Sequence, residues 1–301
     1  MTDAAAAPPL THLPNNKATR LGNVTCVYCG DEGGPDNPLT DEHVVGRRFV
    51  PKGSFATGWC MIARACQSCN NAKADLEDDI SAITLLPDLG ESHDDPNLAA
   101  IAARKARGSR SRRTKKPIID SYEKNKISGK LMQSVDVSFG FTAPPQLDSE
   151  RVRQLAYLHL QAFFYLITYN SERKTGGFIP GAIGWLNEAS RRDWGNSLQR
   201  GFADLTQHWP PRVEGTGASR FFKISIRREP TGAKVWSFAL EWNRALRVIG
   251  FFGNLDHAQS YVDQLQPLNW QRIDATQRMR REIELDPSDD RLFAPVAEAK
   301  E

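Results

Sequence analysis

Two identical cysteine pairs are the feature that most constrains this chain. Cys26 and Cys29 form one Cys-x-x-Cys pair, and Cys66 and Cys69 form a second, with 36 residues between the pairs. Four soft thiolate ligands suit a tetrahedral zinc ion. Because the intervening segment is longer than the roughly 15–20 residues of a simple zinc ribbon, we expect folded structure within it. The remaining cysteine, Cys60, is expected to be a small buried apolar residue.

The composition is that of an ordinary globular protein. Hydrophobic residues make up 40% of the 301 residues and charged residues 25%, which excludes a chain that is disordered throughout. No apolar run approaches the ~20 residues needed to span a bilayer, and the first residues lack the basic and apolar parts of a signal peptide. We therefore expect a cytoplasmic protein with no membrane partner, in which the cysteines bind metal rather than form disulfides.

The charges are distributed unevenly along the chain. Residues 1–100 carry 7 basic against 14 acidic side chains, whereas residues 101–130 carry 11 against 2. Such a concentrated basic block favours binding to a polyanion, so we expect a nucleic-acid partner. The expected phosphate contacts in this block are Arg104, Lys105, Arg107, Arg110, Arg112, Arg113, Lys115 and Lys116.

Polar residues with catalytic potential lie beside the cysteine pairs. The sequence Asp41-Glu42-His43 falls between the pairs, and Asn70 and Lys73 follow the second pair. With the two cysteine pairs, these residues resemble the HNH endonuclease family, the ββα-metal nucleases, over residues 24–80. The resemblance implies two strands and a helix, held together by structural zinc, that hydrolyse a phosphodiester bond.

The resemblance also implies a role for each matching residue. His43 would be the general base that activates water, while Glu42 and Asn70 would hold a catalytic Mg²⁺ or Mn²⁺ ion. Lys73 would contact phosphate. Because Glu42 is one methylene longer than the more usual aspartate, Asp41 remains a competing ligand for the catalytic ion.

The chain departs from the family pattern at three further positions. Asn70 rather than a histidine ends the motif, a substitution that the family tolerates. Gly46 replaces a frequent proline three residues after His43. Met61 stands where an asparagine that orients the histidine is usual. The orientation of His43 must therefore come from another part of the molecule.

The pattern of apolar residues predicts an α+β fold. We expect a ββα-metal nuclease module held together by zinc, followed by a domain of one helix and an antiparallel sheet. The expected segments are a mobile tail (1–22), the HNH module (23–98), a basic helix and linker (99–130), an α+β accessory domain (131–270) and a C-terminal helix or tail (271–301).

Within these segments, the periodicity predicts individual elements. A helix is expected from about residue 65, and another that Asp148 or Ser149 caps. A strand is expected at 131–142, more helix around Trp185, Leu186 and 198–205, and a short helix at 257–265. Three further strands are expected at 222–226, 236–242 and 248–252.

The expected function is metal-dependent hydrolysis of DNA. Three alternatives stay open: a catalytically inactive, zinc-stabilised nucleic-acid-binding protein, a nuclease that acts on RNA, and an interaction protein whose C-terminal domain carries the function. The basic block does not distinguish ribose from deoxyribose. The oligomeric state leaves no mark in the sequence.

Overall fold

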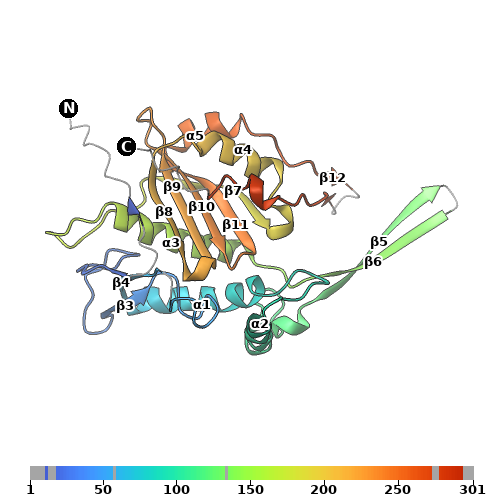
Figure 1. Cartoon of the computed structure of the whole chain (residues 1–301), viewed down its shortest axis with the longest axis horizontal. Helices are drawn as coiled ribbons and strands as arrows, with labels where there is room; N and C mark the ends of the chain where they lie inside the picture. Colours follow the sequence, from blue (N-terminus) through green and yellow to red (C-terminus); the bar gives the residue numbers. More distant parts are fainter. Residues whose placement is uncertain (1–10, 13–17, 57–58, 133–134, 273–277, 294–301) are drawn as a thin grey trace.

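The computed structural model describes residues 11–12, 18–56, 59–132, 135–272 and 278–293. Helices and mainly antiparallel sheets are both well represented, so the predicted α+β class is confirmed (Figure 1). None of the helices in these residues has the length and apolar character needed to cross a bilayer.

A small sheet and the helix that follows it form the N-terminal module, which we define as residues 18–84. In this module β3 pairs antiparallel with β4, so that Leu39 lies opposite Cys66 and His43 opposite Ile62. Since α1 begins directly after β4, the strand–strand–helix order expected from the resemblance is present. The elements are β2 (Thr19–Arg20), β3 (Leu39–His43), β4 (Met61–Cys66) and α1 (Gln67–Thr84).

Part of the predicted mobile tail belongs to the sheets. The amides of Thr19 and Leu21 donate to carbonyl oxygens of Cys60 and Ile62, and β1 (Thr11–His12) pairs in parallel with β8 (Pro211–Gly217). The prediction was wrong for residues 11–12 and 18–22. Their backbone groups pair with β8 and β4, and local periodicity does not predict pairing with strands far along the chain. Residues 1–10 and 13–17 lie outside the described residues.

The predicted basic linker is largely ordered. Helix α2 (Pro96–Gly108) is capped by Asp95, and the short 3-10 helix η1 (Ile118–Asp120) returns to it. Ala106 and Ile118 pack with Ala82 of α1 in a small cluster. This tertiary contact, which the local sequence does not show, holds the basic loop against the N-terminal module.

A long hairpin then extends away from the rest of the molecule (Figure 1). It consists of β5 (Glu123–Met132) and β6 (Val135–Ala143), paired antiparallel. The strand predicted at 131–142 is confirmed from residue 135 onward, but β5 was not expected. The predicted segment boundary between residues 130 and 131 therefore falls inside this hairpin.

The C-terminal sheet has the strand order β1-β8-β9-β10-β11 and packs against helix α3. Asp148 caps α3 by accepting from the amides of Glu150 and Arg151, as expected of one of the two candidate caps. The three predicted strands and the short predicted helix are confirmed. Their bounds are α3 (Ser149–Ile167), β9 (Phe222–Arg228), β10 (Val235–Trp242), β11 (Leu246–Gly253) and α5 (Leu255–Val262).

The predicted helix around Trp185 is wrong, because this segment forms strand β7 (Ala182–Ser190). Ile183 and Trp185 pack against the core on one side, whereas Leu186 packs against a second cluster on the other. This alternation is that of a strand with both faces covered. The helix predicted at 198–205 is confirmed as α4 (Ser197–Thr206).

A helix or a tail was predicted for residues 271–301. The structure contains no α-helix within residues 271–272 and 278–293. This segment consists of the short strands β12 (Gln271–Arg272) and β13 (Arg278–Met279) and the 3-10 helix η4 (Pro287–Asp289). Arg280 pairs with Asp193, and Leu292 is buried. These contacts hold the segment against the C-terminal sheet.

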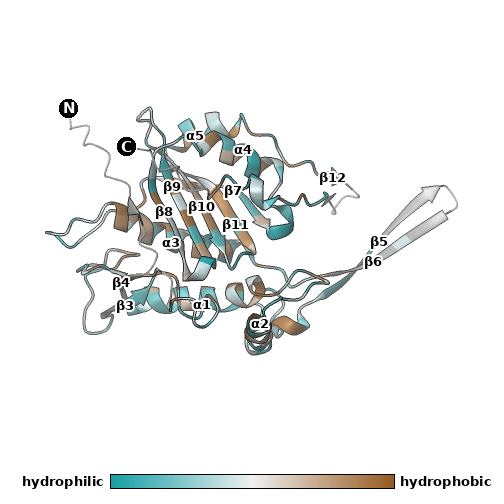
Figure 2. Cartoon of the chain, in the orientation of Figure 1, coloured by the Kyte–Doolittle hydropathy of each residue, from teal (hydrophilic) through white to brown (hydrophobic). Residues whose placement is uncertain are grey.

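One core joins the two predicted folded domains. Phe49 and Met61 of the N-terminal module are buried in the same cluster as α3 and the sheet residues Phe222 and Trp242. Figure 2 shows the hydrophobic residues along α3 and the central strands. On the other face of the sheet, α4 and α5 contribute to a second cluster. Because both faces are covered, every residue of β10 is buried.

Candidate metal centre and catalytic site

The four paired cysteines meet at the start of α1. Their sulfur atoms all lie within 4.8 Å of one another, and Cys29 Sγ and Cys66 Sγ are 3.7 Å apart. Sulfur atoms of a tetrahedral site with Zn–S bonds of about 2.3 Å are separated by about 3.8 Å. The cluster can therefore hold a metal ion, and its geometry is compatible with structural zinc.

The turn at the first pair directs its sulfur atoms into the cluster. The amide of Tyr28 points at Cys26 Sγ at 3.4 Å, and the amide of Gly30 donates to the carbonyl of Cys26 at 2.9 Å. Gly30 has φ +81°, a conformation that glycine adopts without steric cost. Cys66 ends β4 and Cys69 lies in the first turn of α1, so a bound ion would join the turn, the hairpin and the helix.

A bound cation would change the protonation of the thiols in this cluster. Burial raises the pKa of Cys29 to about 11, and burial together with the neighbouring sulfurs raises the pKa of Cys69. Burial would also raise the pKa of Cys66, but hydrogen bonds from Ser68 and Cys69 lower it to about 6. Four adjacent thiolates repel one another, and a divalent metal ion removes this penalty because coordinated thiols lose their protons.

Strand β3 presents two different faces. Thr40 and Glu42 face α1, where the amide nitrogen of Asn70 donates to Thr40 Oγ1 at 3.2 Å and Lys73 approaches Glu42. Successive side chains of a strand point to opposite sides, so Asp41 and His43 share the other face. The structure thus places all the expected polar residues around β3, but it divides them between its two faces.

Glu42 belongs to a buried ion cluster. Lys73 Nζ lies 2.6 Å from Glu42 Oε1 and 2.6 Å from Glu77 Oε1, and the Lys73 side chain is 1% exposed. Burial raises the pKa of Glu42 although Lys73 opposes the shift. Burial acts in the same direction on Glu77, but the charge of Lys73 and the proximity of His159 bring its pKa down to about 2.

This cluster changes the roles expected for Lys73 and Glu42. The ammonium of Lys73 has no access to a nucleic-acid phosphate, so the prediction that Lys73 contacts phosphate is wrong. Charged side chains are buried only where they are paired, and local sequence does not show the burial of a helix face. The carboxylate of Glu42, expected as a metal ligand, is the partner of Lys73 in this structure.

His43 lies half-buried at the end of β3. Arg47 Nε donates to His43 Nε2 at 3.0 Å, so this ring nitrogen is an acceptor. Burial, followed by the positive charges of Arg47 and Lys73, lowers the pKa of His43, whereas Asp41 opposes the shift. The neutral imidazole, which is the form that accepts a proton, is therefore favoured. Exposed Asp41 forms an ion pair with exposed Arg20 beside it.

The buried cluster also positions the backbone around His43. Lys73 Nζ donates to the carbonyl oxygen of His43 at 3.3 Å, and the amide of Gly46 donates to Glu77 Oε1 at 2.9 Å. A Cβ atom at position 46 would lie 2.0 Å from Glu77 Oε2. Proline would have no amide hydrogen and would collide with Glu77. Met61, at the position of the usual asparagine, is buried, and its carbonyl accepts from the amide of Val44.

Sequence reasoning missed three residues of this site. Glu77 could have been found from its i, i+4 spacing to Lys73 on a predicted helix. Tyr28, whose hydroxyl approaches Glu42 at 3.5 Å, and His159, whose Nε2 lies 3.9 Å from Glu77 Oε1, left no signal. His159 comes from α3, so only the packing of α3 on α1 brings it here.

The basic block divides into structural and exposed side chains. Lys105 Nζ contacts the carbonyl of Arg48 and the hydroxyl of Ser81, and burial lowers its pKa to about 8. Arg112 is half-buried and pairs with Asp75. The prediction of phosphate contacts is therefore not supported for these two residues. The side chains that stay exposed are Arg104, Arg107, Arg110, Arg113, Lys115 and Lys116.

Exposed arginines connect His43 with this basic block. Arg47 contacts His43, and the next residue, Arg48, is held to Lys105 of α2 through its carbonyl oxygen. The charge of Arg48 contributes to the lowered pKa of Lys105, so the two cations are close. Positive charge therefore extends from β3 to α2 along the N-terminal module.

The comparisons with known proteins provide no relative for the chain: no family model matches it, and no curated protein or solved structure is similar to it.

Proposed function

We propose that this protein is a metal-dependent HNH-type endonuclease that hydrolyses phosphodiester bonds of DNA. The observation that carries the proposal is the placement of His43. Its accepting ring nitrogen belongs to β3, which pairs with the strand that carries Cys66 of the four-cysteine cluster, and Arg47 and Arg20 are its neighbours. A neutral imidazole beside exposed guanidinium groups combines a proton acceptor with phosphate-binding charge.

In this mechanism His43 accepts a proton from the attacking water. Arg47 is exposed and would transfer its hydrogen bond from His43 to a phosphate oxygen, which frees Nε2 for the water. Lys73 holds the backbone carbonyl of His43, so the imidazole stays at the end of β3. Structural zinc in the cysteine cluster would keep β3 and α1 together during the reaction.

A hard divalent ion, Mg²⁺ or Mn²⁺, would supply charge stabilisation at the phosphate when bound. Two carboxylates compete to hold it. Glu42 shares a face with Asn70 but must release Lys73, which would keep Glu77 as its partner. Asp41 is exposed on the face of His43 and must release Arg20. Glu42→Gln and Asp41→Asn should therefore raise the metal concentration needed for half-maximal cleavage to different extents, and the larger change identifies the ligand.

The six exposed side chains of the basic block would bind the sugar–phosphate backbone. Neutralising six phosphates gives a log–log dependence of affinity on salt with a slope of about −5. Nothing in these contacts reads bases, and RNA remains an alternative substrate because the contacts are to phosphate. The double variant Arg104→Ala, Arg107→Ala should reduce the slope by about 2.

A nicking assay on supercoiled plasmid tests the proposal. The full chain, purified with its metal, is incubated with Mg²⁺, Mn²⁺ or EDTA and compared with His43→Ala and with His208→Ala, a control at an exposed histidine. We expect metal-dependent nicking by the wild type and by His208→Ala, and a loss of about 100-fold or more in His43→Ala. Equal cleavage by all three proteins, or none on DNA and RNA, would exclude the proposed role of His43.

The buried cluster favours one second candidate, a nucleic-acid-binding protein that has lost catalysis. In this interpretation the pairing of Glu42 with Lys73 replaces metal binding. The two candidates differ in one measurement: the second predicts salt-dependent DNA binding that neither Mg²⁺ nor His43→Ala changes, with no nicking.

A further inference from the structure

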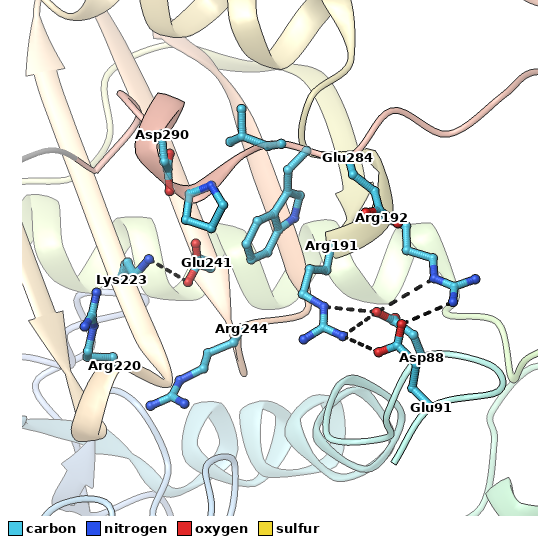
Figure 3. A pocket seen from close by; sticks show the side chains of 13 residues that line it. Asp88, Glu91, Arg191, Arg192, Arg220, Lys223, Glu241, Arg244, Glu284 and Asp290 are labelled. Carbon is cyan, nitrogen blue, oxygen red and sulfur yellow. Dashed lines mark hydrogen bonds and ion pairs between the residues drawn. The ribbon is translucent and has the colours of Figure 1, made fainter. Parts of the chain in front are cut away.

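A charged pocket lies away from His43, between the loop that follows α1 and the C-terminal sheet. Its volume is about 550 Å³, within the range of about 300–1,000 Å³ typical of small-molecule sites. Figure 3 shows Arg220, Lys223 and Arg244 on one side, and Arg191 and Arg192 with Asp88 and Glu91 on the other. The two sides differ in how their charges are balanced.

Most charges of the pocket have partners within the protein. Arg191 Nη2 lies 2.6 Å from Asp88 and 2.9 Å from Glu91, and Arg192 approaches the same two carboxylates. On the opposite side, Glu241 lies 2.9 Å from Lys223. These groups balance one another and leave little charge for a ligand.

Among the cations of the pocket, Arg220 and Arg244 are the exception. Within the described part of the chain, neither guanidinium forms an ion pair with a carboxylate, and both side chains are exposed. Arg244 donates to the carbonyl of Ser219 at 2.8 Å and lies 4.2 Å above the ring of Phe221. Burial, followed by the charge of Arg220, lowers the pKa of Arg244, so the two cations lie close enough to repel each other.

The backbone holds these two arginines in unfavourable conformations. Arg220 has φ +71° and follows Ala218 and Ser219, which also have positive φ; Arg244 has φ +57° and follows Asn243 at +51°. Non-glycine residues rarely adopt such values, and runs of them cluster at binding sites. Two adjacent turns therefore bring two like charges to one side of a cavity, where a bound anion would offset the repulsion between them.

The same pocket offers an apolar surface. Leu285 and Pro287 line it together with Trp194, which is half-buried because the guanidinium of Arg247 lies 3.8 Å from its ring. Glu284 also lines the pocket, on the side of Arg192 and away from Arg220 and Arg244 (Figure 3). A ligand with a doubly charged anionic end and a flat ring fits both parts of this lining.

We propose that this pocket binds a nucleoside monophosphate, with its phosphate between Arg220 and Arg244 and its base against Trp194. Two unpaired guanidinium groups match the charge of one terminal phosphate, and arginine binds phosphate oxygens through paired donors. The site does not depend on the proposed nuclease activity, because binding requires neither His43 nor the cysteine cluster.

Isothermal titration calorimetry on the full chain with its metal tests the proposal. The ligands are the purine and pyrimidine nucleoside 5′-monophosphates, the matching nucleosides, inorganic phosphate and a 5′-phosphorylated oligonucleotide. We expect at least one monophosphate to bind about tenfold more tightly than phosphate or its nucleoside. The double variant Arg220→Gly, Arg244→Gly should weaken this binding about tenfold or more.

Glycine is chosen for both positions because it removes the guanidinium while accepting positive φ, so the fold is expected to be retained. A thermal melt checks this. The matched control is Arg153→Ala, Arg173→Ala, which removes two exposed arginines that do not line the pocket and should leave nucleotide binding unchanged. Trp194→Leu should weaken binding of the monophosphate but not of inorganic phosphate.

Three results would overturn the proposal. One is equal nucleotide affinity in the wild type and a folded glycine double variant. Another is binding of inorganic phosphate as tight as that of every monophosphate, since the base would then contribute nothing. The third is binding of the oligonucleotide alone, which would make the pocket part of a strand-binding surface.

Discussion

Each of two buried cations in this protein lies between two carboxylates, but the two cations contact different parts of the molecule. Lys73 lies between Glu42 and Glu77 in the N-terminal module, and Arg247 lies between Glu241 and Asp290 at the C-terminal sheet. Both cations have side chains that are 1% exposed. Each pair of carboxylates offsets the cost of removing a charge from water.

The difference lies in what each cation holds. Arg247 stacks on Trp194 and joins the C-terminal segment to the sheet, whereas Lys73 donates to the backbone of His43. Glu77, the partner of Lys73, also accepts from the amide of Gly46. Of the two buried ion clusters, only the Lys73 cluster therefore reaches the proposed general base.

Removing the metal should produce the largest difference in stability between the regions around the Lys73 and Arg247 clusters. A chelator is expected to destabilise the N-terminal module by an amount of order 10 kcal/mol, because four thiols without a cation no longer join the turn at Cys26, β4 and α1. Hydrogen exchange should then show fast exchange in β3 and α1, with β9–β11 still protected. Equal exchange in both regions would mean that the two parts unfold as one unit.

Removing either cation should destabilise the protein. Lys73→Met leaves two buried carboxylates unpaired, for which we expect a loss of about 3–5 kcal/mol in the free energy of unfolding, measured in urea. Arg247→Met should cost less, because Glu241 keeps its ion pair with Lys223 and Asp290 is partly exposed. Only Lys73→Met is expected to reduce nicking activity under conditions where both variants remain folded. Equal activity of the two variants would contradict a positioning role for Lys73.

A methyl group at position 46 should disturb the Lys73 cluster alone. Gly46→Ala places its Cβ against Glu77, which is fixed by Lys73, so we expect a loss of about 1–3 kcal/mol in the free energy of unfolding. Gly34→Ala is the matched control, because a Cβ there would have no atom within 4 Å. A stable Gly46→Ala protein would show that Glu77 moves without cost.

Acidification should weaken the N-terminal side of the shared core. His159 is fully buried among Phe49, Phe222 and Trp242, and burial lowers its pKa, as it does for His43. The unfolded chain then binds more protons than the folded protein as the pH falls through about 6.5, so stability decreases toward acid. His159→Phe should reduce this dependence in urea unfolding at about pH 7.5 and 5.5, whereas His208→Ala should not.

The exposed pair Arg20–Asp41 should matter least for stability. Both side chains are more than half exposed, so Arg20→Ala is expected to change the free energy of unfolding by no more than about 1 kcal/mol. The contribution of this ion pair to the free energy of unfolding should be smaller still at high salt. A larger loss would mean that this pair, like Lys73, holds β3 in place.

Local sequence patterns predicted much of the fold. The period of apolar residues located α1, α3 and the strands β9–β11, and the two candidate caps Asp148 and Ser149 marked the start of α3. The same reasoning placed a helix at Trp185, because apolar residues on both faces of a covered strand do not alternate with polar ones. It also missed β5 and the short strands β1 and β2, whose pairing depends on partners far along the chain.

For the candidate site, the cysteine spacing predicted the metal-binding cluster, and the family resemblance implied that Glu42, His43 and Asn70 lie close together. Neither predicted that Glu42 is paired with Lys73, or that Lys105 is held by backbone and hydroxyl oxygens. These outcomes depend on which side of a helix is covered, and that is decided by the elements that pack on it.

The sequence by itself therefore determined the residues that can bind a metal, accept a proton or attract a polyanion, because these properties belong to residue types and their spacing. The tertiary structure alone decided which charges are buried. Packing α3 and the C-terminal sheet on α1 removes Lys73, Glu77 and His159 from water, and it leaves Arg47, Arg220 and Arg244 exposed. The free energy of a charge depends on its surroundings more than on its position in the chain.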